Sequence, residues 1–229
     1  MRLVSQNTPR TVLITDADQF LGPAAVDRFR DEGDAVTALT EPLRSREQTA
    51  QLVGDLGPFD VLIANLEAPI TVAPITEHDD ATVSEAFSRL VDPLFWLFAA
   101  CLPGMIQAGG GAVVVPTSAT AIRNSTHPIA AYQAARAAQI SLVRSVGREM
   151  AHHRVRVNGV APNFIENPSY FPPETVSDPA FQESLRTIVP AQRMGRGAEA
   201  ASILWWLTSH EASYVFGAVI PADGGWTLG

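Results

Sequence analysis

Short apolar runs alternate along the chain with longer segments in which apolar and polar residues are mixed. The runs are rich in Val, Ile, Leu and Ala, which is typical of strands buried on both faces of a parallel sheet. The strands predicted from these runs are 11–15, 35–39, 60–64, 112–115, 155–160 and 218–220.

The longer segments have the spacing of amphipathic helices. In the first of them, Pro23 suits the first helical turn and Gly33 the end of the helix. The predicted helices are 22–32, 45–53, 80–107, 129–152, 179–188 and 198–209. Segment 162–179 is instead rich in Pro, Asn, Ser and aromatic residues, and its length indicates a functional loop.

Strands that alternate with helices in this way predict an α/β fold, a Rossmann-like doubly wound parallel sheet with helices on both faces. The length favours one domain over residues 1–229. Ligands of such sheets bind at the carboxyl ends of the strands, where the strand order reverses. The residues that follow the strands ending near Thr15, Ala64, Val115 and Val160 are therefore the candidates for function.

Composition excludes several classes of function. The net charge of −8 gives no general attraction to nucleic acid or to an anionic membrane surface. All 16 basic residues are arginine, so Schiff-base chemistry on lysine and a P-loop lysine are both excluded. The single Cys101 excludes an internal disulfide framework, and no His spacing suggests a metal site. The apolar run 94–102 is too short to span a bilayer and no signal peptide is recognised, so we expect a cytoplasmic enzyme.

The loop after the first predicted strand is unusual for a dinucleotide-binding loop. Such a loop needs glycines, which make a tight turn and let backbone N–H groups approach the pyrophosphate. Here only Gly22 is present, Asp16 and Asp18 would put negative charge against a diphosphate, and Phe20 is bulky. This loop therefore argues against NAD binding, and the alternative is an ordinary strand–helix turn.

A hydroxyl, a phenol and a permanent cation follow the fourth strand. Ser118 lies at its carboxyl end, and Tyr132 and Arg136 are four residues apart on a predicted helix, so they share one face. Taken singly, each has an ordinary structural explanation: a turn cap, a core residue and a solvated charge. Their combination at the mouth of the sheet predicts a catalytic site.

This pattern, with the terminal Ala222-Asp-Gly-Gly225, resembles the short-chain dehydrogenase/reductase superfamily over nearly the whole chain. Two departures resemble one branch of it, the halohydrin dehalogenases. Arg136 stands where the reductases have a lysine, and Thr15-x4-Phe20-x-Gly22 replaces the glycine-rich loop.

The resemblance implies a carbon–halide lyase that needs no cofactor. A vicinal halohydrin would close to an epoxide with release of halide and a proton, and small anions would open epoxides in reverse. Ser118 would bind the substrate hydroxyl and Tyr132 would accept its proton. A nearby cation lowers the pKa of a phenol, which is about 10 when free, so Arg136 would favour the phenolate.

The resemblance also implies a halide pocket in place of the nicotinamide site, formed by Phe20, Pro162, Asn163, Phe164 and Ile165. We expect the backbone N–H groups of residues 163–165 to donate to the anion, as in a nest. The expected substrate-lining residues are Thr120, Tyr170 and Phe171. The segment between Ser118 and Tyr132 is one residue longer than is usual in the family, and Thr117 or Thr120 is the alternative hydroxyl.

The expected partners are a small halohydrin or epoxide and a halide or other small anion, with no nucleic acid, no membrane and no metal. A homotetramer is expected by resemblance. Two alternatives remain open at this point. One is an NAD(P)-dependent short-chain dehydrogenase/reductase with a degenerate cofactor loop, and the other is a non-catalytic reductase-like protein.

Overall fold

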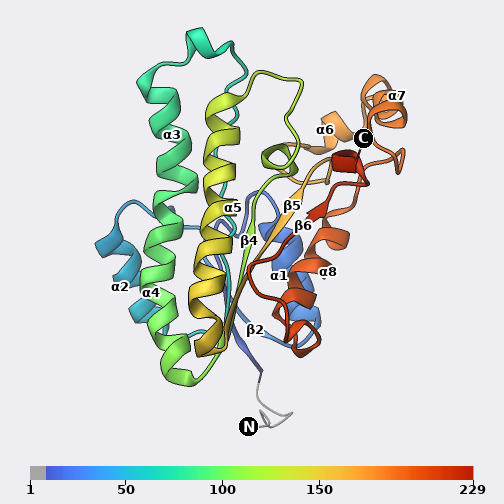
Figure 1. Ribbon diagram of the computed structural model, residues 1–229. Helices are drawn as coiled ribbons and strands as arrows, with labels where there is room; N and C mark the ends of the chain where they lie inside the picture. The colour runs from blue at the N-terminus through green and yellow to red at the C-terminus, as the bar shows by residue number, and fades with distance from the viewer. Residues whose placement is uncertain (1–8, 229) are drawn as a thin grey trace.

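The computed structural model describes residues 9–228 (Figure 1). The strands are β1 Thr11–Ile14, β2 Ala35–Ala38, β3 Val61–Ile63, β4 Gly111–Pro116, β5 Val155–Pro162 and β6 Val219–Ala222. The helices are α1 Gly22–Asp31, α2 Arg46–Leu56, α3 Asp80–Leu90, α4 Asp92–Ala108, α5 Ala130–Met150, α6 Pro173–Val176, α7 Pro179–Ile188 and α8 Gly197–Thr208.

The strands form one parallel sheet in the order β2-β1-β3-β4-β5-β6. The order reverses beside β1, because the chain first adds β2 on one side and then β3 on the other. All the carboxyl ends meet at one edge, which is the upper edge in Figure 1. The predicted doubly wound α/β sheet is confirmed.

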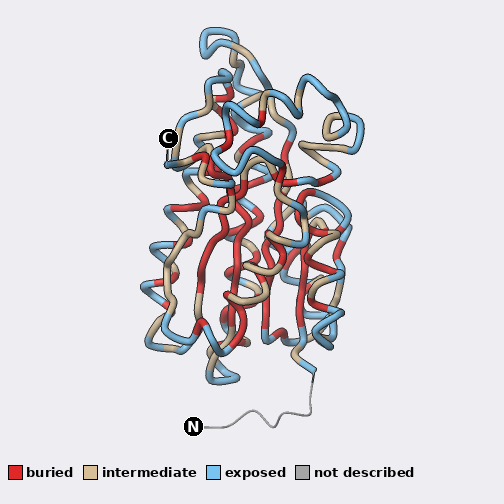
Figure 2. Tube along the Cα trace, turned by 90° about the vertical axis from the view of Figure 1, so that its right-hand side faces the viewer, coloured by how far each residue is buried: buried red, intermediate tan, exposed pale blue. Residues whose placement is uncertain are grey.

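Successive strand residues face opposite sides of the sheet, and each side is covered by helices. Leu13 and Val113 pack into the core beneath α4 and α5, whereas Val12 and Val114 pack into the core beneath α1 and α8. Both faces are therefore buried, as the continuous apolar strands predict. Figure 2 shows the buried residues concentrated along the strands and the exposed ones on the outer helix faces.

The segment 80–107 was predicted as one helix, but the structure divides it into the two helices α3 and α4. The two helices, α3 and α4, are separated by the single residue Val91, whose backbone stays in the right-handed helical region. Pro93 lies in the first turn of α4, where its missing N–H costs no hydrogen bond, and proline disfavours helical geometry in the residue before it. A new helix therefore begins where a single one was expected.

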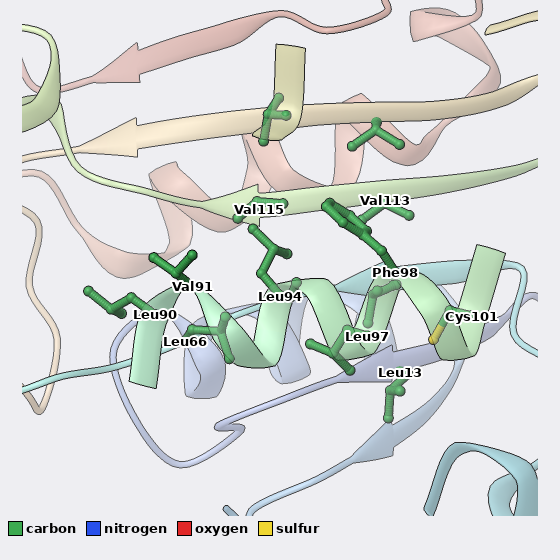
Figure 3. Packing of buried hydrophobic residues seen from close by; sticks show 14 of the residues in the cluster. Leu13, Leu66, Leu90, Val91, Leu94, Leu97, Phe98, Cys101, Val113 and Val115 are labelled. Atoms are coloured by element: carbon green, nitrogen blue, oxygen red, sulfur yellow. The ribbon is translucent and has the colours of Figure 1, made fainter. Parts of the chain in front are cut away.

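The apolar face of α4 packs on the sheet. Leu94 and Phe98 point toward the strand residues Val113 and Val115 (Figure 3). Segment Asp80–Ala108 is long and apolar enough to cross a membrane by composition, but half of its most apolar window is buried inside the protein. It is the core helical layer of a soluble fold.

The predicted loop 162–179 contains one short helix, α6, which the sequence pattern did not indicate. The rest is irregular and is tied down by a bridge between Ile165 and Gly195 and another between Asn167 and Phe171. Asn167 is buried, and its Oδ1 accepts the N–H of Tyr170 at 2.8 Å. These contacts hold Tyr170 over the carboxyl edge of the sheet.

Candidate active site

A cavity of about 1060 Å³ opens at the carboxyl edge of the sheet. Residues that follow four strands line it, among them Phe20 after β1, Glu67 after β3, Ser118 after β4 and Asn163 after β5. The predicted site residues that line this cavity are Phe20, Ser118, Thr120, Tyr132, Pro162, Asn163, Phe164, Ile165, Tyr170 and Phe171. Arg136 is not among the lining residues, because it lies behind Tyr132.

The hydroxyl of Ser118 is at the predicted place, at the end of β4 on the cavity wall. Its Oγ forms a hydrogen bond with Oγ1 of Thr120 at 2.8 Å, and both residues line the cavity. Thr117, the other alternative hydroxyl, is fully buried and donates to the carbonyl of Val160 at 3.1 Å. Thr117 is thereby removed as a candidate, and Ser118 and Thr120 remain as a bonded pair.

The guanidinium of Arg136 is fully buried. Its Nη1 donates to the carbonyl of Pro116 at 3.2 Å and to Oε1 of Gln139 at 3.0 Å, and its Nη2 donates to the hydroxyl of Tyr170 at 3.2 Å. Its Nε has no hydrogen-bond partner in the structure. Within residues 9–228 no carboxylate forms an ion pair with it. A buried cation is thus balanced by neutral acceptors alone.

Three aromatic rings surround this cation. Its Cζ lies 5.1 Å from the ring centroid of Phe20 and 5.0 Å from that of Tyr132. The ring of Tyr170 packs edge-on against both rings, with centroids 5.2 Å from Phe20 and 5.9 Å from Tyr132. Burial works against the charge of Arg136, but the charge and hydrogen-bonding effects of Tyr132 and Tyr170 raise its pKa above the ordinary value.

Tyr170 lines the cavity as expected, but its hydroxyl has a further role. Its ring does line the cavity, but its hydroxyl points inward, donating to the carbonyl of Ala68 at 2.9 Å and accepting from Arg136. Burial is the main cause that raises the pKa of Tyr170 far above its usual value, so this phenol stays protonated. The sequence gives little sign of this inward hydrogen bonding beyond the presence of a tyrosine in the segment 162–179.

The β1–α1 loop folds onto itself. Asp16 and Phe20 both have positive φ, 41° and 45°, an uncommon conformation for residues other than glycine. Gly22 closes the loop, because a Cβ there would lie 2.3 Å from the carbonyl oxygen of Asp16. This glycine therefore serves the turn itself and not a bound phosphate.

Four backbone donors of this loop are engaged within the protein. The N–H groups of Gln19 and Gly22 donate to loop carbonyls, that of Ala17 donates to Leu39, and that of Phe20 donates to Oγ of Ser169 at 2.8 Å. A pyrophosphate needs such donors free at the start of the following helix, and Pro23 in the first turn of α1 has no N–H to give. The loop therefore offers few free donors to a pyrophosphate and fits a nicotinamide dinucleotide poorly.

Asn65 is a structural residue that the sequence reasoning missed. It is fully buried after β3, and its Nδ2 donates to the carbonyls of Asp16 and Gln19 at 2.9 and 3.0 Å. Its only sequence signal is an amide directly after a buried strand. The carboxylate of Asp16 also bonds the N–H of Glu67 at 2.9 Å. Burial raises the pKa of Asp16 and of Glu67.

The expected anion nest over residues 163–165 is wrong for two of its three donors. The N–H of Asn163 donates to the carbonyl of Ala222 at 3.2 Å, and that of Phe164 donates to Oδ1 of Asn163 at 3.0 Å. Only the N–H of Ile165 has no bonded acceptor in the described part of the chain. Phe164 instead packs its ring against Phe171 and Trp226, with centroids 5.7 and 6.2 Å away.

Metal chemistry finds no support in the side chains: the described residues contain no group of three or more His, Cys, Asp or Glu side chains that could hold an ion.

A family model described as enoyl-(acyl carrier protein) reductase matches residues 10–227. Among curated proteins, the chain is 28% identical to 2-keto-3-deoxy-L-fuconate dehydrogenase of Xanthomonas campestris, over 94% of this chain and 71% of that protein. It is 31% identical to galactitol 2-dehydrogenase of Rhizobium johnstonii, over 93% of this chain and 89% of that protein.

Among solved structures, a protein titled dehalogenation enzyme superposes with a TM-score of 0.82 and 26% identity, covering 96% of this chain and 98% of that one. A halohydrin dehalogenase bound to ethyl (2S)-oxiran-2-ylacetate superposes with a TM-score of 0.86 and 23% identity, covering 94% and 96%, which is a likeness of fold alone. With its parallel sheet, with Ser118 and Tyr132 lining one cavity, and with a family match over nearly all its length, the chain belongs to the short-chain dehydrogenase/reductase superfamily.

Proposed function

We propose that the protein is a halohydrin dehalogenase that works without a nicotinamide cofactor. The reaction converts a vicinal halohydrin into an epoxide, a halide ion and a proton. The substrate O–H bond breaks, its oxygen attacks the neighbouring carbon, and the carbon–halogen bond breaks with its electron pair going to the halide. In reverse, a halide or another small anion opens an epoxide.

One observation carries the proposal. The rings of Phe20 and Tyr170 cover Arg136 on the side of the β1–α1 loop, where a nicotinamide dinucleotide would approach the site in this fold. Hydride transfer needs that cofactor next to the substrate. Ring closure of a halohydrin needs only a base, a positioned hydroxyl and a place for the halide.

The proposed roles follow from position. Ser118, with Thr120 beside it, binds the substrate hydroxyl at the end of β4. Tyr132, on the same cavity wall, takes its proton as the general base. Arg136 touches no substrate but stabilises the phenolate from behind, and a buried site makes this attraction stronger than in water. An arginine stays charged throughout, so it does not compete as a base.

For the leaving halide we propose the part of the cavity next to Ile165. Ile165 packs in the same cluster as Phe20 and Tyr170, and its N–H is the donor left over from the expected nest. Aromatic rings carry a positive edge that tolerates an anion. Pro162, Asn163 and Phe164 then shape the wall of this subsite and do not supply its donors.

A second candidate function follows from the curated relatives, which are named as dehydrogenases. On that interpretation the protein oxidises an alcohol or reduces a ketone with NAD(P). Its β1–α1 loop would then bind the cofactor in spite of its unusual structure. A non-catalytic reductase-like protein is the third interpretation. The three differ in whether the protein turns over substrate and whether it binds a dinucleotide.

The test uses purified full-length protein, checked for copurified nicotinamide, and a small vicinal bromo-alcohol with no added cofactor. We expect bromide and protons to be released in equal amounts, and Tyr132→Phe to lower the rate by about 10²–10⁴-fold, the usual contribution of a general base. Tyr214→Phe is the matched control, because Tyr214 is almost fully exposed.

The result decides among the three interpretations. Release that is lost in Tyr132→Phe and kept in Tyr214→Phe supports the dehalogenase. Absence of release from small and bulky halohydrins, together with binding of NADH or NADPH followed by fluorescence, overturns it in favour of a dehydrogenase. Absence of both favours the non-catalytic protein.

The expected homotetramer and the cytoplasmic location also remain proposals. Light scattering on the eluting protein measures the first directly.

A further inference from the structure

The hydroxyl of Tyr170 has a complete set of hydrogen bonds inside the protein. It donates to the carbonyl of Ala68 at 2.9 Å and accepts from the N–H of Ala68 at 3.3 Å and from Nη2 of Arg136 at 3.2 Å. A phenolic hydroxyl has one proton to donate and two lone pairs to accept with. This hydroxyl is therefore fully used as a link between the segment after β3 and the guanidinium on α5.

The guanidinium of Arg136 also contacts a second tyrosine, Tyr132. Arg136 lies 5.0 Å from the ring centroid of Tyr132, whose ring is 5.9 Å from that of Tyr170 at an interplanar angle of 72°. One phenol is fixed and keeps its proton, and the other faces the cavity. The two tyrosines thus have different roles beside the same guanidinium: Tyr170 is held in internal hydrogen bonds, and Tyr132 faces the cavity.

Other charged or titratable groups lie around this pair, and Arg123 and Arg186 are among those that line the cavity. Asp16 in the β1–α1 loop and Glu67 after β3 act on Arg136 at longer range, and Arg89 of α3 acts on both carboxylates. His127 lines the same cavity. None of these groups bonds the guanidinium, so its orientation depends on Pro116, Gln139 and Tyr170.

We propose that Tyr170 is a positioning residue, whose hydroxyl fixes the Arg136 guanidinium where it stabilises the Tyr132 phenolate. The inference rests on the proposed function in so far as it concerns turnover. Two of the three acceptors of Arg136 come from β4 and from α5 itself, and only Tyr170 links it to the loop after β5. Without that acceptor, Nη2 turns away from its fixed direction and the phenolate loses part of its stabilisation.

The first experiment compares pH profiles of kcat/KM for halohydrin turnover in the wild type and in Tyr170→Phe, which keeps the ring and removes only the hydroxyl. We expect the acid limb to move up by about one pH unit, so that the rate on that limb falls about tenfold while the alkaline plateau is unchanged. A merely structural role would lower the rate equally at every pH. Tyr214→Phe makes the same chemical change at the surface and is the control.

The second experiment needs no turnover. The chain has three tyrosines, so tyrosinate absorbance near 295 nm can be assigned with Tyr132→Phe, Tyr170→Phe and Tyr214→Phe. We expect Tyr170→Phe to move to higher pH the step that disappears in Tyr132→Phe. If the wild type dehalogenates nothing but this step still moves, the proposed function fails and the positioning role stands.

Three outcomes overturn the proposal. One is an acid limb and a tyrosinate step that stay in place in Tyr170→Phe, and another is an equal loss of rate at all pH values. The third is an acid limb that disappears in Glu67→Gln, because it would then belong to that carboxylate. Should Tyr170→Phe fail to fold by near-UV circular dichroism, Tyr170→Leu lacks the same acceptor and gives the same test.

Discussion

The guanidinium of Arg136 lies against the ring of Phe20, with Cζ 5.1 Å from the ring centroid. This contact joins α5 to the loop after β1, on the side of the sheet where dinucleotides bind in folds of this kind. A desolvated contact of this kind is worth up to about 2 kcal/mol. Phe20, which we propose keeps a dinucleotide out of the site, therefore also helps to hold the buried cation.

Phe20→Leu keeps an apolar side chain but removes the aromatic face. We expect a loss of about 1–2 kcal/mol in the free energy of unfolding, since the cation loses one of its two ring contacts. Urea denaturation measures it. Phe95→Leu, on the half-exposed outer face of α4, is the matched control and should change stability by less than about 0.5 kcal/mol. Equal effects of the two substitutions would contradict the prediction.

Arg136→Lys keeps the charge but not the geometry. One ammonium group cannot reach the Pro116 carbonyl, the Gln139 amide and the Tyr170 hydroxyl together. We expect a loss of about 1–3 kcal/mol in unfolding free energy. Because Arg136 does not line the cavity, kcat should fall with KM changed by less than about two-fold. Arg46→Lys, at an exposed position, is the control, and a change confined to KM would count against this role.

Asn65→Ala removes the side chain that fixes the β1–α1 loop. The carbonyls of Asp16 and Gln19 then lose their bonds to Nδ2. We expect destabilisation by about 2–4 kcal/mol, because buried acceptors without a donor are costly. Thermal or urea unfolding measures it against the exposed Asn124→Ala. A change below about 0.5 kcal/mol would show that the loop holds its shape without Asn65.

Asp16→Asn tests a buried carboxylate. Burial raises the pKa of Asp16 in the folded protein, so folding is favoured most below its unfolded pKa and stability declines as the pH rises through the folded value. Asparagine keeps an acceptor for the N–H of Glu67 without the charge. We expect the variant to have the higher Tm near pH 7 and this advantage to vanish below about pH 4. Asp55→Asn, at an exposed position of α2, should show no such dependence.

The sequence predicted most of the fold because its signals are local. Most of the buried strands are continuous apolar runs, and several helices begin or end near a proline or glycine, so the element order and the parallel sheet could be predicted directly. The break at Val91 was missed, since α3 and α4 are both apolar and their periodicity continues across Pro93. Only the packing on the sheet distinguishes the two helices.

The candidate site was predictable where strand ends and helical spacing place residues together. Ser118 and Tyr132 come to line one cavity in this way, with Arg136 behind the tyrosine. The anion nest was not predictable, because the direction of each N–H in residues 163–165 depends on Ala222 and on the side chain of Asn163. Hydrogen bonds between distant segments leave no periodic signal.

By itself, then, the sequence determined the strand order along the chain, the two apolar faces and the presence of a hydroxyl, a phenol and a guanidinium at one edge. The tertiary structure alone decided that Tyr170 and Arg136, 34 residues apart, share a hydrogen bond, and that Asn65 holds the loop which carries Phe20. The physical reason is that buried polar groups must find partners wherever the folded chain brings them, at separations that no sequence pattern encodes.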